Sequence, residues 1–241
     1  MIHVSILGAS GRMGGLAKQL VDADSNLKLH SALDSSSPKE QMLGADVVID
    51  FTNPTVSESL VLFAIESGLK TVVGTSGWSE QKLGVLEKAL KTSPMSAVVV
   101  VPNFSVGSML AQRFAAMAAK YFDSIEILEA HHEQKVDSPS GTAIRTAELI
   151  ADARKDLPQH LIPGVGQPGR GVVHAGVVIH SLRQKGISAK QDNIFGADGE
   201  QLVISHDVSS PRAYSLGILR SIEFAQTATG LTVGLENVLG K

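Results

Sequence analysis

The chain has 241 residues, of which 43% are hydrophobic and 19% charged, and its formal net charge is −3 at pH 7. This length can bury a sizeable core and suits two modest domains or one large domain. The small negative charge and the 4% of aromatic residues argue against nucleic-acid binding. The sequence has no cysteine, no secretory leader and no apolar run of eighteen residues, so we expect a complete cytoplasmic protein without a membrane segment.

The first predicted elements are a strand and a helix joined by a glycine-rich turn. The strand HVSILG runs into GASGRMGGLAKQLVDA, where Gly8, Gly11 and Gly14 are followed by an amphipathic helix. A second strand, LKLHSALD, ends at Asp34, twenty residues after Gly14, where dinucleotide sites place an acid that binds the ribose. We therefore predict a pyrophosphate at the helix N-terminus and an adenine ribose at Asp34. The alternatives are glycines used only for packing and a plain loop acid.

The alternation of strands and helices continues to residue 104. Strands are predicted in ADVVIDFT, LKTVVGT and MSAVVVVPNF, with helices between them. Their nearly continuous apolar runs are typical of strands covered on both faces, so we predict a doubly wound parallel sheet of the Rossmann type. Ligands of such sheets bind at the carboxyl ends of the strands. At these ends Thr75, Ser76 and Asn103 are candidates to bind a nicotinamide or its ribose, and Phe104 is a candidate to pack against a ring of the ligand. Each of these residues also fits an ordinary turn.

Residues 105–212 have a different pattern. SVGSMLAQRFAAMAAKYF predicts a helix whose core face is the stripe Leu110, Phe114, Met117 and Tyr121. Further on, GVVIHSLR, ISAKQDNIF and QLVISHDV predict strands, the last two joined by a hairpin turn at ADGE. We expect a second α+β domain with a mixed or antiparallel sheet. The final helix and strand are expected to return to the first domain, so that the domains are residues 1–104 with 213–241, and 105–212.

The stretch EAHHEQKVDSPSGTA, residues 129–143, carries more chemistry than folding requires. It begins in a predicted strand whose alternation places Glu129 and His131 on one face and His132 on the other. Lys135 follows in a loop. A histidine in a strand is commonly a hydrogen-bonded core residue and a lysine a solvated charge, but together they indicate acid–base catalysis. A metal site is disfavoured, because the two histidines are adjacent and no cysteine is available.

A helix is predicted directly after this loop, with Ser138 or Ser140 as its N-cap. The first-turn amides on or near Gly141 and Thr142 are candidates to bind an anion, and Gly141 lets a ligand approach the backbone. An imidazole, an ammonium group and a helix N-terminus thus point to a carboxylate substrate.

Six motifs extend this interpretation to a known family. GASGRMG, DVVIDFTNP, VVGTSG, PNFSVG, EAHHEQKVDSPSGTA and GLENVLG occur in this order and span the chain. By these motifs it resembles the family of 4-hydroxy-tetrahydrodipicolinate reductases, also known as dihydrodipicolinate reductases. The resemblance implies a Rossmann domain, a mixed-sheet domain that builds a homotetramer, and a small dicarboxylate substrate. It implies NAD(P)H-dependent reduction of (2S,4S)-4-hydroxy-2,3,4,5-tetrahydrodipicolinate to tetrahydrodipicolinate, with loss of water, in lysine and diaminopimelate biosynthesis.

The resemblance also implies roles for individual residues. His131 matches the catalytic proton donor or acceptor, and Lys135 the second proton donor. The matched substrate contacts are His132, Ser140, Gly141 and Thr142. The matched cofactor contacts are Gly8, Ala9, Ser10, Gly11, Arg12, Met13, Asp34, Gly74, Thr75, Ser76, Val101, Pro102, Asn103 and Phe104. Because the two sets belong to different domains, we predict a hinge closure when both ligands bind.

Two positions depart from the family pattern. Many relatives carry a basic residue after the ribose-binding acid, whereas Asp34 is followed here by Ser35. This favours NADH, because a carboxylate repels the 2′-phosphate of NADPH, although Arg12 or Lys39 leaves NADPH binding open. Lys190 stands where relatives usually have a histidine near the second sheet.

Three alternative functions remain open on the sequence. A Rossmann dehydrogenase of an amino acid semialdehyde would share the first hundred residues but not need the His-His-x-x-Lys and Ser-Gly-Thr groups. A non-catalytic dinucleotide sensor would not need the proton donors. A structural assembly module would not need the glycine turn paired with Asp34.

Overall fold

The computed structural model describes residues 1–158, 164 and 166–240. They form two compact units, the first comprising Met1–Val106 with Pro211–Lys241 and the second Gly107–Ser210. Each unit has its own β-sheet and its own buried residues.

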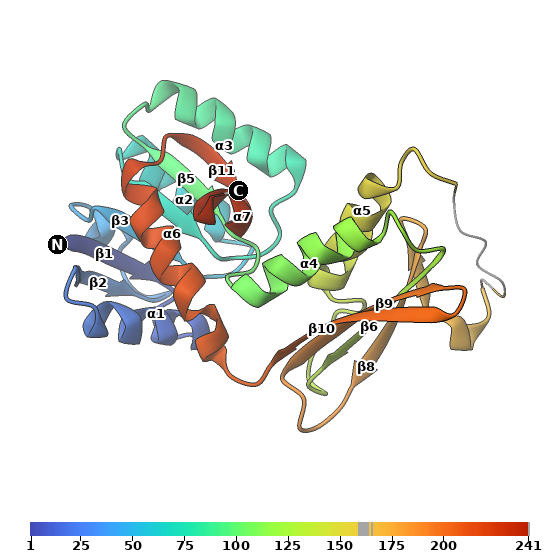
Figure 1. Ribbon diagram of the computed structural model, residues 1–241. Coiled ribbons are helices and arrows are strands. Elements are labelled where there is room, and N and C mark those ends of the chain that lie inside the picture. The colour runs from blue at the N-terminus through green and yellow to red at the C-terminus, as the bar shows by residue number, and fades with distance from the viewer. Residues whose placement is uncertain (159–163, 165, 241) are drawn as a thin grey trace. The chain divides into compact units, whose positions relative to one another are not determined.

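The first unit contains a six-stranded sheet in which all neighbouring strands run parallel (Figure 1). This confirms the predicted doubly wound α/β fold. Strands β3 and β5 are buried at every residue, because helices cover both faces of the sheet. The strands, in sheet order, are β11 (Gly230–Val233), β5 (Ala97–Val100), β4 (Lys70–Val73), β3 (Val47–Asp50), β1 (Ile2–Leu7) and β2 (Leu27–Leu33).

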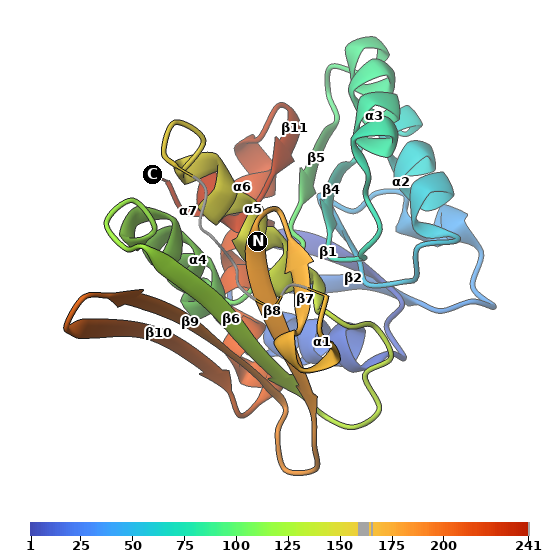
Figure 2. The ribbon, with the colours of Figure 1, turned by 90° about the vertical axis from the view of Figure 1, so that its right-hand side faces the viewer.

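Helices α1 (Arg12–Ala23) and α6 (Ser215–Thr227) contact each other on one face of this sheet. Helices α2 (Ser57–Glu66) and α3 (Glu80–Thr92) contact each other on the opposite face (Figure 2). Shorter helical segments complete the unit: η1 (Lys39–Met42), η3 (Pro211–Tyr214) and α7 (Leu235–Leu239). The carboxyl ends of the parallel strands lie together at one edge, which is where such sheets bind ligands.

The second unit contains a five-stranded mixed sheet (Figure 2). Strands β6 and β8 run parallel, and the other neighbouring pairs run antiparallel. The predicted hairpin is confirmed, with Asp198 and Gly199 at its turn and Gly199 at φ +82°. In sheet order the strands are β10 (Glu200–Val208), β9 (Ala189–Ala197), β6 (Ser124–His131), β8 (Val177–Arg183) and β7 (Val172–His174), with η2 (Pro168–Arg170) preceding β7.

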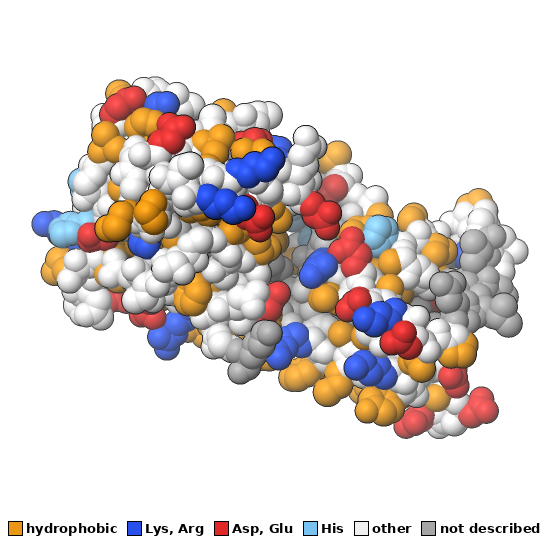
Figure 3. All heavy atoms as spheres, turned by 90° about the horizontal axis from the view of Figure 1, so that it is seen from above, with side chains coloured by type: hydrophobic (Ala, Val, Ile, Leu, Met, Phe, Trp, Pro, Cys, Tyr) orange, Lys and Arg blue, Asp and Glu red, His pale blue; other side chains and the backbone are white. Residues whose placement is uncertain are grey.

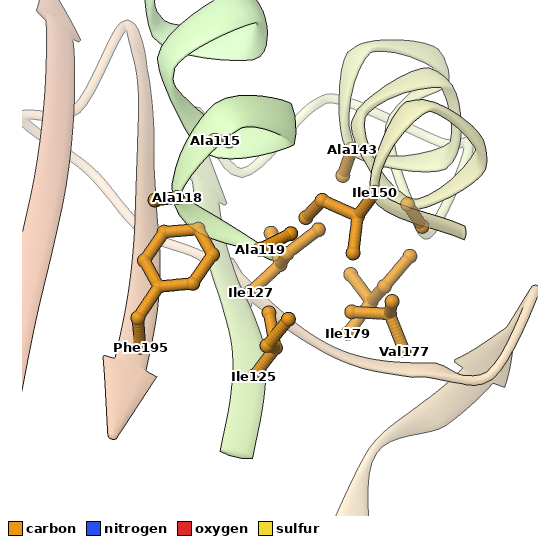
Figure 4. Packing of buried hydrophobic residues seen from close by; sticks show 11 residues of the cluster. Ala115, Ala118, Ala119, Ile125, Ile127, Ala143, Ile150, Val177, Ile179 and Phe195 are labelled. Atoms are coloured by element: carbon orange, nitrogen blue, oxygen red, sulfur yellow. The ribbon is translucent and has the colours of Figure 1, made fainter. Parts of the chain in front are cut away.

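The core of the second unit lies between its sheet and helices α4 (Val106–Ala118) and α5 (Gly141–Ala153). Figure 4 shows Phe195 of β9 beside Ala118 of α4, and Ile127 of β6 beside Ala119, the residue after that helix. It also shows Ile150 of α5 beside Ile179 of β8. The bulk of this core therefore comes from the strands and from α5.

The prediction that an apolar stripe forms the core face of α4 was wrong. The exposed fraction is 39% at Leu110 and rises to 78% at Tyr121, which lies beyond the end of the helix. The buried face carries Ala111, Ala115 and Ala118 instead. Small side chains let the helix backbone approach the sheet closely, and Phe195 fills the remaining space. The exposed stripe consists of Leu110, Phe114, Met117 and Tyr121.

The surface is mixed in character. On the face seen in Figure 3, acidic and basic side chains are interspersed with hydrophobic ones rather than gathered by sign. None of the helices in the described ranges combines the length and the hydropathy that crossing a bilayer requires.

Candidate active site

The predicted catalytic histidine lies at the end of β6, beside a buried carboxylate. Alternation along the strand places Glu129 and His131 on the face that packs against the helices. The Nδ1 atom of His131 lies 2.6 Å from Oε2 of Glu129. The Glu129 side chain is fully buried, whereas that of His131 is 16% exposed. His131 therefore has an opening to solvent and an acid partner behind it.

Arg183 binds the other side of the same carboxylate. It is the β8 residue that pairs with His131 in the parallel ladder. Its Nη1 lies 3.0 Å from Oε2 of Glu129, and its Nη2 lies 2.9 Å from Oε1. Burial raises the pKa of Glu129, but hydrogen bonds from His131, Arg183 and Ser181 outweigh that effect and lower the pKa to about 2. Glu129 is thus ionised at neutral pH.

Lys135 lies in the loop after β6 and forms an ion pair within that loop. Its Nζ lies 2.7 Å from Oδ1 and 2.8 Å from Oδ2 of Asp137. The hydrogen bond from Lys135 lowers the pKa of Asp137 more than burial raises it. The lysine side chain is 21% exposed and that of Asp137 is 62% exposed, so an arriving anion can reach this ammonium group.

Helix α5 begins next to these groups. Ser140 is its N-cap, and the Ser140 hydroxyl accepts a hydrogen bond from the amide of Ala143 at 3.2 Å. The amide of Ser140 donates to Oε1 of Glu129 at 3.2 Å, so the start of the helix is tied to the end of β6. Gly141 is exposed, and a Cβ at this position would meet no neighbouring atom within 4 Å. The space beside this first helical residue is open to a ligand.

The structure brings most of the predicted catalytic and substrate residues to one place in the second unit. His131, Lys135, Ser140 and Gly141 all lie where β6 ends and α5 begins, as does Thr142 in the first turn. His132 lies one residue beyond β6, so strand alternation does not set its direction; its carbonyl accepts from the amide of Lys135. These positions agree with the predicted set, and the catalytic roles stay predictions.

Arg183 and Asp137 were missed by the sequence reasoning. Asp137 stands two residues from Lys135, a separation at which an ion pair is a reasonable guess. Arg183 offered no such local signal. Its contact with Glu129 joins residues 54 positions apart and becomes visible only when β6 and β8 are paired.

The glycine turn after β1 is closely packed in the first unit. A Cβ on Gly14 would lie 2.1 Å from the carbonyl oxygen of Gly8, and a Cβ on Gly8 would lie 2.5 Å from that of Phe51. Gly11 is the N-cap of the twelve-residue helix α1, and no side chain caps this end. Glycine at these positions lets the turn pack closely against the end of β3 and the start of α1. A tight turn of this kind suits a pyrophosphate at the start of α1. Ala9, Ser10, Arg12 and Met13 belong to this same turn and helix start.

Asp34 stands directly after β2 and is held in a tight turn. Its Oδ1 accepts from the amide of Ser36 at 2.9 Å, from the Ser36 hydroxyl at 2.7 Å and from the Ser37 hydroxyl at 3.1 Å. The Ser36 hydroxyl, followed by the Ser36 amide and the Ser37 hydroxyl, lowers the pKa of Asp34. A negative charge is thereby fixed at the position predicted for the adenine ribose.

The ends of β3, β4 and β5 are packed through aromatic rings. Phe51 and Phe104 meet edge to face with centroids 5.5 Å apart, and a Cβ on Gly74 would lie 2.3 Å from the Phe51 ring. Phe104 is only 4% exposed. The Thr75 hydroxyl is buried and lies 3.4 Å from the carbonyl oxygen of Asp50, so a contact from Thr75 to a ligand would come from its backbone. The other predicted contacts at this edge are Ser76, Val101, Pro102 and Asn103.

Potential metal ligands do not gather at this site or elsewhere in the described residues. In the part of the chain that the structure describes, no three histidine, aspartate or glutamate side chains lie close enough together to hold an ion.

The parallel sheet, the glycine turn after β1 and the second mixed-sheet domain define the class of two-domain dinucleotide-binding oxidoreductases. The family model "Dihydrodipicolinate reductase, N-terminus" matches residues 2–104, and "Dihydrodipicolinate reductase, C-terminus" matches residues 107–239. The chain belongs to the dihydrodipicolinate reductase family.

Individual relatives agree with the family models. The 4-hydroxy-tetrahydrodipicolinate reductase of Clavibacter sepedonicus is 47% identical over 236 residues, which cover 98% of this chain and 85% of that protein. The reductase of the same name from Cutibacterium acnes is 40% identical over 244 residues, covering 100% of this chain and 99% of the relative. Among solved structures, dipicolinate-bound dihydrodipicolinate reductase from Paenisporosarcina sp. TG-14 has a TM-score of 0.84 and 30% identity, covering 98% of this chain and 99% of that one.

Proposed function

We propose that this protein reduces 4-hydroxy-tetrahydrodipicolinate to tetrahydrodipicolinate with a reduced nicotinamide dinucleotide, in lysine and diaminopimelate biosynthesis. The observation that carries the proposal is the grouping of His131, Lys135 and the start of α5 at one end of β6, on a chain whose relatives bear this enzyme's name. In the reaction a hydride and a proton are added to the substrate, and its hydroxyl group leaves as water. The solved relative with bound dipicolinate supports a small dicarboxylate as substrate.

We assign the proton chemistry to residues of the second unit. His131 has its Nδ1 on Glu129, which leaves Nε2 to give or take a proton at the substrate. The Lys135 ammonium is a second donor and a counter-charge for one carboxylate, since that carboxylate can replace Asp137 as its partner. His132, Ser140, Gly141 and Thr142 are proposed substrate contacts around the first turn of α5.

The first unit is proposed to hold the dinucleotide. Its pyrophosphate would lie on the turn from Gly8 to Met13, where Ser10, Gly11 and Arg12 are exposed at the start of α1. The carboxyl ends of β4 and β5 would hold the nicotinamide, which would supply the hydride. Gly74 to Ser76 and Val101 to Phe104 form the edge proposed to orient it.

We propose that NADH is preferred over NADPH. Asp34 is ionised and exposed, so it can accept a hydrogen bond from the ribose 2′-hydroxyl and repels a 2′-phosphate. Replacing Asp34 by serine should therefore raise KM for NADH and shift the ratio of kcat/KM values toward NADPH by about 10- to 100-fold. Steady-state kinetics with each cofactor measure the ratio. Asp22→Ser removes another exposed acid, on α1, and should leave the ratio unchanged. An unchanged ratio in Asp34→Ser would contradict the role of Asp34.

Gly141 offers a test of the substrate contact. The position is helical and open, so Gly141→Ala should leave the free energy of unfolding unchanged or raise it by about 0.4–1 kcal/mol. The added methyl group would meet the substrate carboxylate, and we expect KM for the substrate to rise about tenfold, a cost of roughly 1.4 kcal/mol. Gly84→Ala in α3 is the matched control, because its Cβ also meets open space. Equal KM values in the two variants would argue against a carboxylate at Gly141.

We further propose a cytoplasmic homotetramer that assembles through the second unit. The sheet face turned away from α4 and α5 carries Leu182 and Val203, each 47% exposed, with Ile194 directly opposite Val203 in the ladder. Apolar side chains exposed on a sheet face are a common assembly surface. Val203→Lys should therefore lower the mass measured by light scattering. A tetramer that withstands Val203→Lys together with Leu182→Lys would rule this face out.

A coupled assay tests the proposed function as a whole. The substrate would be generated from pyruvate and aspartate semialdehyde by the preceding synthase, and the loss of absorbance followed separately with NADH and NADPH. Consumption that depends on the synthase product supports the reductase and ranks the cofactors. Binding of both cofactors without consumption would favour a dinucleotide sensor or a different substrate.

A further inference from the structure

The buried carboxylate of Glu129 receives hydrogen bonds from three parts of the second unit. Oε2 lies next to Nδ1 of His131 and Nη1 of Arg183, and Oε1 lies next to Nη2 of Arg183 and the amide of Ser140. The Ser181 hydroxyl also donates to this carboxylate, and because a hydroxyl can equally accept, it adapts to either group at its position. A fully buried carboxylate is costly unless it is paired and hydrogen-bonded. These bonds offset that cost and hold the side chain in one position.

The charge of Glu129 determines which nitrogen of His131 carries the proton. An ionised carboxylate can only accept hydrogen bonds, so at 2.6 Å the Nδ1 atom must be the donor. The neutral imidazole then has its lone pair on Nε2, the atom that faces away from Glu129. The side chain is 16% exposed, so the ring is not closed off from a ligand. A ring with the opposite tautomer would present an N–H to the ligand and a lone pair to the carboxylate.

Arg183 links this pair to the loop that carries Lys135. All five of its N–H donors have acceptors: two on Glu129 and one each on the carbonyl oxygens of Lys135, Asp137 and Leu182. A lysine has three donors and no planar fork, so it cannot reproduce this set. One guanidinium group thus fixes both the carboxylate behind His131 and the backbone that places Lys135.

We propose that Glu129 is the positioning residue for His131, and that Arg183 fixes Glu129 relative to the loop that carries Lys135. Glu129 keeps the proton of neutral His131 on Nδ1 and stabilises the imidazolium ion while Nε2 also carries a proton. When Nε2 gives that proton to the substrate, the ring returns to its neutral Nδ1–H form, and Glu129 stays ionised throughout. The inference deepens the proposed function, because it rests on His131 being the proton donor or acceptor.

The Glu129→Gln variant gives the proposal a distinctive signature. If the new amide nitrogen took the place of Oε1, it would face two obligatory donors, Nη2 of Arg183 and the amide of Ser140. If it took the place of Oε2, it would face one such donor and His131, whose ring can accept by changing tautomer. The second arrangement is the less costly one. Glu129→Gln should therefore move the proton of neutral His131 from Nδ1 to Nε2.

Nitrogen-15 NMR of ring-labelled histidine in the full chain measures this tautomer without substrate or cofactor. Spectra are recorded at increasing pH until the ring is neutral, and His131→Asn assigns the signal. We expect the Nδ1–H form in the wild type and in Glu129→Asp, and the Nε2–H form in Glu129→Gln. Glu126→Gln is the matched control, because Glu126 contacts His180 on the other face of β6 and should not affect His131. An Nε2–H signal in the wild type would overturn the proposal even if Glu129→Gln failed to fold.

Kinetics separate this inference from the function on which it rests. We expect kcat of Glu129→Gln to fall by about 10²- to 10⁴-fold, with partial recovery in Glu129→Asp and little change in KM for the dinucleotide. If Glu129→Gln leaves the tautomer unchanged, the positioning role fails while the role of His131, tested by His131→Ala, still stands. A changed tautomer with undiminished kcat, together with full activity of His131→Ala, would overturn both.

Discussion

Replacing His131 by alanine should lower kcat by about 10²- to 10⁴-fold, the range typical for the loss of one positioned proton donor or acceptor. The expected result follows from its place at the end of β6, with Nδ1 on a buried carboxylate and Nε2 left for the substrate. Dinucleotide affinity should stay nearly unchanged, because the glycine turn and Asp34 belong to the first unit. Steady-state turnover and fluorescence titration with NADH measure the two quantities.

Lys135→Ala should behave in the same way, with an added rise in KM for the substrate because a counter-charge for the carboxylate is lost. His30→Ala is the matched control for the histidine, since His30 is exposed in β2 and bonds only the carbonyl oxygen of Leu43 among the contacts of the described residues. Turnover at the wild-type level in both His131→Ala and Lys135→Ala would refute the proposed roles.

Replacing Arg183 by methionine should lower the free energy of unfolding by about 3–5 kcal/mol, the usual cost of leaving a buried charge without its partner. Glu129 is fully buried, and Arg183 supplies two of its hydrogen bonds as well as three to backbone carbonyls. Urea unfolding at pH 7, followed by circular dichroism, measures the change. Arg145→Met removes a surface arginine that pairs with Glu148 on α5 and should cost less than about 0.5 kcal/mol.

The ion pair between Arg183 and Glu129 should also make the free energy of unfolding depend on pH. The pKa of Glu129 is lowered from 4.5 to about 2, which corresponds to about 3 kcal/mol. Because the folded-state pKa is depressed, this contribution is fully present above pH 4.5 and is lost as the pH falls toward 2. In Arg183→Met the loss of stability across this pH range should be smaller.

Adding Glu129→Gln to Arg183→Met should recover part of the free energy of unfolding at pH 7. A double variant that is no more stable than Arg183→Met would show that the buried charge of Glu129 is not the cause.

Several elements of this protein follow from local sequence. The apolar runs VVI, TVV and AVVVV predicted strands covered on both faces, and these strands lie in the parallel sheet. Asp198 and Gly199 predicted the hairpin between β9 and β10. The alternation in IEILEAHH predicted a strand that is followed by a loop, and Ser138 or Ser140 was predicted to cap the next helix; the structure places the cap at Ser140. In each case neighbouring residues decide the outcome, because backbone preference and side-chain period act over a few positions.

Tertiary packing decided the rest. The amphipathic pattern of α4 indicated a helix with large apolar residues on one side, but contact with Phe195 selected the alanine side for the core. The arginine that binds Glu129 could not be predicted from local sequence either. Arg183 lies 54 residues away and reaches Glu129 only through the pairing of β6 with β8. The sequence by itself thus determined which elements form and which groups are the candidates for the chemistry. Only the tertiary structure decided which arginine binds Glu129 behind His131, since strand pairing depends on the packing of the whole unit rather than on local preference.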